Sequence, residues 1–120
     1  MQQPSDQRLY FFVDESGDPY FYNRDGELII EKEGCSKILM LGFIKTSDPG
    51  LVRSRIRDLQ RNIANDPYFR NIPSAKKSIL SFHATDDIPE IRERVYKTII
   101  TLPIKAEFIV ARKLEPVFIK

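Results

Sequence analysis

The sequence Leu9-Tyr10-Phe11-Phe12-Val13 leads directly into Asp14-Glu15-Ser16-Gly17-Asp18. Five consecutive apolar residues are too few for a typical helix, and they favour a strand that is buried on both faces. Gly17 interrupts the acidic residues and lets the backbone turn sharply. An α/β sheet usually presents catalytic or metal-binding groups where such a strand ends, because rigid backbone meets solvent there. We therefore expect a functional site at Asp14.

The composition is typical of one folded domain of 120 residues, with 42% hydrophobic and 30% charged residues. A formal net charge of +2 does not by itself indicate a nucleic-acid partner, so any basic surface has to come from local clustering. Cys35 is the only cysteine, which excludes an intrachain disulfide and fits a reducing compartment. The N-terminus lacks the apolar core of a signal peptide, and no apolar run approaches the roughly 20 residues of a membrane span. We predict a soluble, cytoplasmic protein with no membrane partner.

A hairpin and two further strands are expected. Tyr20–Tyr22 and Glu27–Ile30 flank Asn23-Arg24-Asp25-Gly26, a pattern typical of a hairpin with a tight turn. Lys37–Ile44 is a second long apolar run, and Gly42 inside it indicates a bulge or close packing by a neighbouring element. The third segment, Ala106–Ala111, lies near the end of the chain.

Two amphipathic helices are predicted between these strands. Ser47-Asp48-Pro49 opens the first, and Asn65-Asp66-Pro67 ends it. Its apolar stripe consists of Val52, Ile56, Leu59 and Ile63. The second helix ends at Pro103, and its stripe consists of Ile88, Ile91, Val95, Ile99 and Leu102. Between them we expect a polar connector, Tyr68–Ser78, and a short apolar segment, Ile79–Phe82.

Antiparallel strands followed by helices and a further strand predict an α/β fold with a mixed β-sheet covered by helices. A ribonuclease-H-like domain, with a meander of strands and an acidic residue on the first, fits this order. The apolar end of the chain, Pro116–Lys120, leaves two interpretations open: a final strand docked on the core, or the continuation of a longer protein.

Two motifs resemble the domain-of-unknown-function 3800 family. The first is Phe12-Val13-Asp14-Glu15-Ser16-Gly17-Asp18, and the second is Phe82-His83-Ala84 with an acidic pair and the helix from Ile91-Arg92 to Val95-Tyr96. The similarity extends from about Leu9 to about Arg112. It implies a ribonuclease-H-like fold and an uncharacterised protein, since the family has no generally established activity. Members typically continue into a later segment with a further aspartate, which implies that residues 1–120 are the N-terminal part of a longer, single domain.

Asp14 is the leading candidate for a metal ligand. Mg²⁺ and Mn²⁺ prefer carboxylate oxygens, and two-metal phosphoryl chemistry needs several of them. Asp14 occupies the place of the shared metal ligand on the first strand of ribonuclease-H-like nucleases, and Asp18 is a second candidate ligand. In the alternative interpretation, both residues shape a turn by binding backbone amides. Glu15 points to the opposite face of the strand, and a nucleophilic role for Ser16 is disfavoured because the chain has one histidine.

His83, the only histidine, is a candidate general base or metal ligand beside Asp14. A structural hydrogen-bonding role is the alternative. The neighbouring acids, Asp86 and Asp87, have a simpler explanation than catalysis, because Asp87 and Glu90 match a capping box for the second helix.

Arg53, Arg57 and Arg61 recur at intervals of four on the first helix and could contact a phosphate backbone. The alternative is an ordinary solvated helix face. Lys76-Lys77 adds to the local basic charge, and Cys35 is expected to be an incidental packing residue.

Two functional hypotheses follow. The first is a metal-dependent nuclease or phosphodiester hydrolase that uses Mg²⁺ or Mn²⁺ at Asp14, with His83 nearby. The second is a noncatalytic module of the same fold that binds nucleic acid or protein. A homodimer that buries the apolar residues Val117–Ile119 is a further hypothesis.

Overall fold

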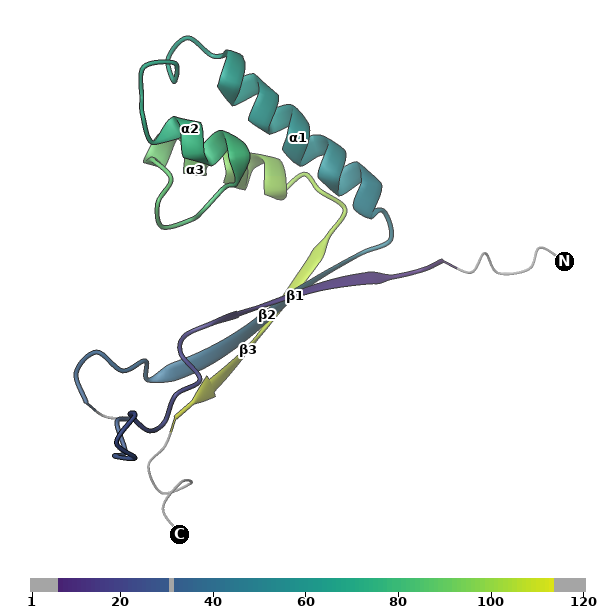
Figure 1. Ribbon diagram of the computed structural model, residues 1–120. Coiled ribbons are helices and arrows are strands. Elements are labelled where there is room, and N and C mark those ends of the chain that lie inside the picture. The colour runs from purple at the N-terminus through teal and green to yellow at the C-terminus, as the bar shows by residue number, and fades with distance from the viewer. Residues whose placement is uncertain (1–6, 31, 114–120) are drawn as a thin grey trace, which may run out of the picture. The chain divides into compact units, whose positions relative to one another are not determined.

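The computed structural model describes residues 7–30 and 32–113. Its elements are, in chain order, β1 (Tyr10–Ser16), β2 (Ile38–Thr46), α1 (Pro49–Asn65), α2 (Ala75–Leu80), α3 (Pro89–Ile99) and β3 (Lys105–Arg112) (Figure 1). The predicted tail interactions of Val117–Ile119 lie outside the described residues.

The described residues divide into two compact units, a sheet unit formed by residues 9–30, 32–46 and 104–113 and a helical unit formed by residues 7–8 and 47–103. The positions of the two units relative to one another are not determined. The expected cover of helices over the sheet and the single domain therefore stay predictions. The coarse fold class is confirmed, because three helices and a three-stranded sheet give a mixed α and β structure.

The sheet has the order β1-β2-β3, and both strand pairs are antiparallel. The sheet was expected to be mixed, but its described strands are all antiparallel. In the register, Asp14 lies opposite Gly42, and Gly42 lies opposite Phe108 on its other side. Since directly opposite residues share a face, this row places all three positions on one face of the sheet.

The prediction that the first strand is buried on both faces is wrong. Every residue of β1 is exposed, and the same holds for β3. The physical reason is position: β1 and β3 are the edges of the sheet, whereas β2 lies between them and is mostly half-buried. An apolar run predicts a strand, but it does not say which place in the sheet that strand takes.

The predicted hairpin forms, although its two arms pair only next to the turn. The Gly26 N–H donates to the Asn23 carbonyl at 3.1 Å, and Gly26 has a φ of +79°, as a tight turn requires. Beyond the turn, the two arms meet in one isolated bridge between Tyr22 and Leu28. The hairpin therefore belongs to the loop between β1 and β2, and the place beside β2 that a meander would give it is taken by β3.

Gly42 allows close packing, which was one of the two predicted roles for it. The register of β2 runs without a bulge on either side of Gly42. A Cβ added at Gly42 would lie 3.0 Å from Cδ1 of Phe108. The Phe108 ring therefore lies over Gly42, on the face that carries Asp14.

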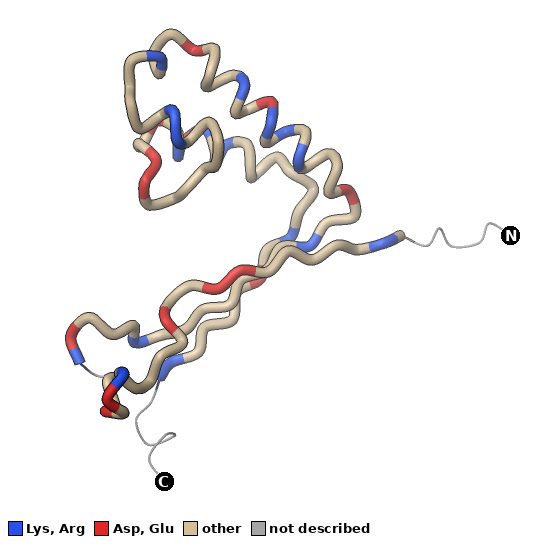
Figure 2. Tube along the Cα trace, in the orientation of Figure 1, with Lys and Arg blue, Asp and Glu red and all other residues tan. Residues whose placement is uncertain are grey.

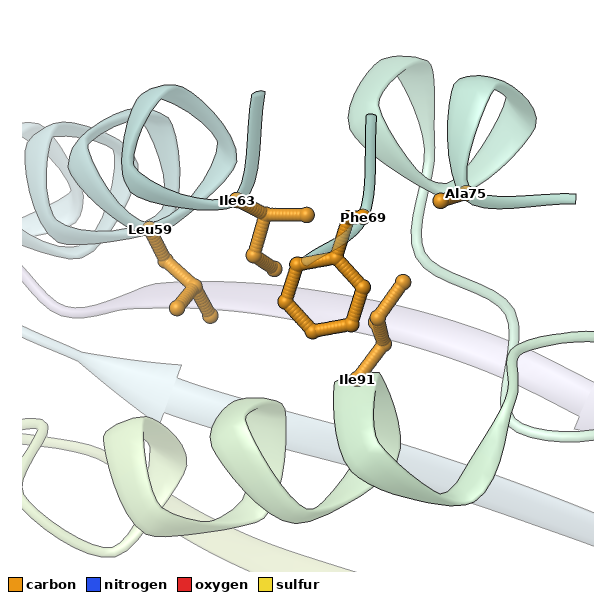
Figure 3. Packing of buried hydrophobic residues seen from close by; sticks show 5 residues of the cluster. All are labelled: Leu59, Ile63, Phe69, Ala75 and Ile91. Carbon is orange, nitrogen blue, oxygen red and sulfur yellow. The ribbon is translucent and has the colours of Figure 1, made fainter. Parts of the chain in front are cut away.

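The helical unit has a small apolar core between its three helices. Its buried residues are Leu59, Ile63, Phe69, Ala75 and Ile91 (Figure 3). Leu59 and Ile63 come from the predicted stripe of α1, while Ile91 comes from that of α3. The Arg94 guanidinium donates to the Asp66 carboxylate at 2.7 Å and lies 4.8 Å from the centre of the Phe69 ring, which ties the end of α1 to α3.

The connector and the second helix differ from the prediction. Residues 75–80, expected to be polar connector and apolar segment, form α2, because burying Ala75 and Ser78 stabilises this short helix. Helix α3 ends at Ile99, so Leu102 lies beyond it. The start of α1 is confirmed: Asp48 is its N-cap, and the Asp48 side chain accepts from the Leu51 N–H at 2.9 Å.

Candidate functional site

Asp14 stands on an exposed part of β1 with part of its carboxylate free. Its Oδ1 accepts from the neighbouring Glu15 N–H at 3.0 Å, and the described residues give Oδ2 no hydrogen-bond partner. The side chain belongs to a strand that is paired along its whole length with β2, so its backbone is fixed. Asp14 is therefore a rigidly placed carboxylate with lone pairs open to solvent.

A shallow pocket of about 350 Å³ lies beside this carboxylate on the sheet. Its lining includes Phe12, Asp14, Gly42, Ile44 and Phe108. The Phe108 ring lies over Gly42 and forms part of the pocket wall. The pocket is thus mainly apolar, and Asp14 and Glu15 are the acidic residues in its lining.

Asp18 has entirely different surroundings, because both of its oxygens are engaged. Oδ1 accepts from Lys113 Nζ at 2.8 Å and from the Tyr20 N–H at 3.2 Å, while Oδ2 accepts from the Ser36 N–H at 3.0 Å. The Lys113 ammonium and then the Ser36 amide hold the pKa of Asp18 below its ordinary value of 3.8. These contacts describe an anchor for the loop between β1 and β2, and the predicted metal role of Asp18 stays a prediction.

Lys113 completes this anchor, and the sequence reasoning missed it. Its side chain is only 2% exposed, and Nζ also donates to the Tyr20 carbonyl at 3.1 Å. Cys35 packs at the same place, with its Sγ 4.0 Å from Lys113 Nζ, in keeping with a packing role. No local pattern signals the pair, because Asp18 and Lys113 are 95 positions apart.

His83 is exposed in the helical unit. Its Nδ1 lies 3.4 Å from Asp86 Oδ2, and both side chains are more than half exposed. Asp14 belongs to the sheet unit, and the two units are described separately, so the partnership between Asp14 and His83 stays a prediction.

The predicted capping box at Asp87 is wrong. The N-cap of α3 is Ile88, and no side chain caps that helix. Asp87 is instead buried, and its carboxylate accepts from Ser78 Oγ at 2.5 Å and from the His83 N–H at 2.8 Å. Asp87 therefore joins α2 to the segment that carries His83 and fixes the backbone of that histidine.

A basic ridge runs along α1, and we define it as Arg53, Arg57 and Arg61. Residues four apart share a helix face, and all three side chains are exposed. Figure 2 shows Lys and Arg positions in blue along α1. Arg61 donates to Asp58 at 2.8 Å, which neutralises part of the charge. Ile79 of α2 lines the same shallow surface as Arg57 and Arg61, so the exposed side of α2 adjoins the ridge.

Within residues 7–30 and 32–113, no three His, Cys, Asp or Glu side chains gather closely enough to hold a metal ion together. Over the same residues, no helix combines the length and apolar character of a membrane crossing. A metal at Asp14 would thus depend on one described carboxylate together with water and substrate oxygens.

Comparison with known proteins gives no match to a protein-family model, a curated protein or a solved structure. The family resemblance drawn from Phe12–Asp18 and from the segment around His83 therefore stays a prediction.

Proposed function

We propose that the chain forms a ribonuclease-H-like domain that hydrolyses phosphodiester bonds with Mg²⁺ or Mn²⁺ held at Asp14. The observation that carries the proposal is the contrast between two nearby acids. Both oxygens of Asp18 accept hydrogen bonds, from Lys113 and from amides of its loop, whereas Asp14 keeps an oxygen free on a rigid strand. A cation needs a carboxylate with a free oxygen, as Asp14 has.

The residues present fit a largely hydrated ion. Mg²⁺ usually keeps several waters and binds proteins through one or two carboxylates plus substrate phosphate oxygens. Asp14 supplies one such ligand, and the resemblance implies a second, an aspartate from a later segment. When bound, the metal would lower the pKa of a water and polarise the phosphate.

The chain's own residues would position the substrate. The pocket beside Asp14 offers the Phe108 ring, which is 67% exposed, as a surface on which a base or sugar can pack. His83 would serve as a general base, and Asp87 would support it by fixing its backbone.

Cleavage of labelled single-stranded DNA, duplex DNA and RNA with Mg²⁺ or Mn²⁺ tests this proposal. Asp14→Asn should lower the rate by at least about a hundredfold, since it removes the charged ligand. Glu15→Gln is the matched control: it is the exposed neighbour on the opposite face of β1, and it should keep its activity. A wild-type chain that cleaves none of these substrates, or an Asp14→Asn variant as active as wild type, contradicts the proposal.

Binding of nucleic acid without cleavage is the second candidate, and the basic ridge favours it. Three exposed guanidinium groups on one helix face are suited to phosphate contacts that do not read sequence. This candidate needs no metal and no cleavage. Binding that weakens with salt and occurs without Mg²⁺ or Mn²⁺ would favour it over the first.

A further inference from the structure

The helical unit has a shallow groove between α1 and α2, and the basic ridge forms one of its sides. We call it the α1–α2 groove. Its volume is about 380 Å³, and it is lined by Arg57, Gln60, Arg61, Ala64 and Ile79. The Gln60 Nε2 donates to the Leu80 carbonyl at 3.3 Å, which ties α1 to the end of α2. The groove therefore lies on two helices that are held together by their own contacts.

The α1 side of this groove carries positive charge that a ligand can use. Arg53 and Arg57 are exposed, and neither has an ion-pair partner among residues 7–30 and 32–113. Arg61 pairs with Asp58 at 2.8 Å, but both side chains are more than half exposed, and such a pair contributes little to stability. An anionic ligand can therefore replace Asp58 at low cost.

The α2 side adds a further cation. Lys76 is exposed and precedes Ile79 by three residues, so the two share a face of α2. Since Ile79 lines the groove, Lys76 lies beside it. Positive charge thus borders the groove from both helices, and this charge selects an anionic ligand.

The spacing of the basic ridge suits a regular row of phosphates. Residues four apart follow one another at about 6 Å along a helix axis, so Arg53, Arg57 and Arg61 form a line about 12 Å long. Phosphates along one nucleic-acid strand recur at an interval of the same order. Guanidinium groups in such a row hold a strand in place without reading its sequence.

The apolar part of the groove distinguishes an unpaired strand from a duplex. Ala64 is exposed and Ile79 is half-buried beside the arginines, and the neighbouring Leu80 is 82% exposed. Unpaired bases pack on apolar side chains and on guanidinium planes. A duplex hides the faces of its bases, so it would contact the arginines and leave this apolar surface uncovered.

We propose that the α1–α2 groove binds single-stranded nucleic acid, with consecutive phosphates along the basic ridge and an unpaired base on Ala64 and Ile79. This inference rests on the nucleic-acid ligand proposed above, and it deepens that proposal by naming the unpaired strand as the ligand class. It uses residues of the helical unit alone, so it requires neither a metal ion nor Asp14.

Fluorescence anisotropy of the full chain in EDTA tests the ligand class, because metal-dependent cleavage cannot interfere. The probes are a labelled oligothymidylate, a duplex of the same length and an abasic strand of the same length. Oligothymidylate should bind at least about fivefold more tightly than each of the other two, since packing of a base contributes about 1–3 kcal/mol.

The outcomes of this experiment separate the inference from the proposal on which it rests. Equal affinity for the three probes would overturn the inference and leave nucleic-acid binding driven by charge. Binding of none of them would overturn both. Displacement of the probe by polyglutamate as effectively as by unlabelled oligothymidylate would identify an acidic protein as the ligand class and would also overturn the inference.

Two charge variants test where the strand binds. Ala64→Glu places a carboxylate in the groove, whereas Asn62→Glu makes the same change of charge on the other flank of α1. Both positions are exposed and glutamate favours helices, so both variants should fold, as circular dichroism can check. Ala64→Glu should weaken oligothymidylate binding at least about fivefold, and Asn62→Glu less than about twofold, because repulsion of phosphate falls with distance. Equal weakening by the two variants would contradict binding in the groove.

Discussion

At the scale of single residues, Asp14 and Asp18 have different surroundings although they lie four positions apart. Asp18 lies in the loop after the Gly17 turn, where a buried ammonium and two amides bind its oxygens. Asp14 lies in the strand, where regular pairing with β2 occupies the backbone and leaves the carboxylate in solvent. The sequence shows two similar acids, and the structure distinguishes them by the contacts of Asp18 with loop amides and with Lys113, 95 positions away.

Replacing Asp18 should destabilise the sheet unit. Asp18→Asn leaves Lys113, 2% exposed, as a charge without its carboxylate, which is costlier than losing the pair altogether. We expect Asp18→Asn to lower the melting temperature by several degrees and Lys113→Met to lower it less. Thermal melts by circular dichroism measure this, with Asp25→Asn, an exposed aspartate of the same loop, as control. A Lys113→Met variant less stable than Asp18→Asn would contradict the account of the ion pair.

The same contact has a defined pH dependence. The pKa of Asp18 is lowered in the folded protein. The stability that its charged form contributes to the fold is therefore present above the ordinary pKa of 3.8, and it is lost as the pH falls through the folded pKa. The difference in melting temperature between wild type and Asp18→Asn should therefore be full at pH 7 and shrink in acid below about pH 4. A difference that is the same at pH 7 and pH 3 would show that the charge of Asp18 is not the cause.

At the scale of elements, local signals predicted α1 well. Its N-cap Asp48, its proline Pro49 and its apolar stripe are all local signals in the sequence, and the structure places each as expected. The short helix α2 was missed because its stability comes from burying Ala75 and Ser78 against other elements. For β1 the strand was predicted correctly and its burial was not, since burial depends on which strands pair beside it.

The core of the helical unit gives a quantitative prediction. Ile63 is fully buried between α1 and its neighbours, so Ile63→Ala should cost about 2–5 kcal/mol of unfolding free energy. Ile100 is 81% exposed, and Ile100→Ala should change stability by less than about 0.5 kcal/mol. Urea denaturation of both variants measures the difference. Similar costs at the two positions would mean that the core around Ile63 is misassigned.

At the scale of the whole molecule, two surfaces support a nucleic-acid substrate: the free carboxylate on the sheet and the basic ridge on α1. Sequence reasoning found the residues of both surfaces, because charge and spacing are local properties. It could not find the Phe108 ring over Gly42, since 66 positions separate them and only the sheet register brings them together.

The basic ridge predicts a salt-dependent affinity for nucleic acid. Each phosphate contact contributes about −0.7 to −0.9 to the slope of log affinity against log salt. Replacing Arg53, Arg57 and Arg61 by Gln should therefore make the slope about two units less steep, as measured by fluorescence anisotropy with single-stranded DNA. A control variant with Arg24, Lys32 and Lys37 replaced by Gln removes equal charge from the sheet unit. Equal losses in the two variants would point to net charge and exclude a specific role for the ridge.

The most direct test of the role of Asp14 is Mn²⁺ binding followed by electron paramagnetic resonance, which reports the free ion. The account predicts that the wild type and Glu15→Gln reduce the free signal alike, while Asp14→Asn binds at least about tenfold more weakly because its charged oxygen is gone. Binding of Mn²⁺ by Asp14→Asn with wild-type affinity would contradict the account.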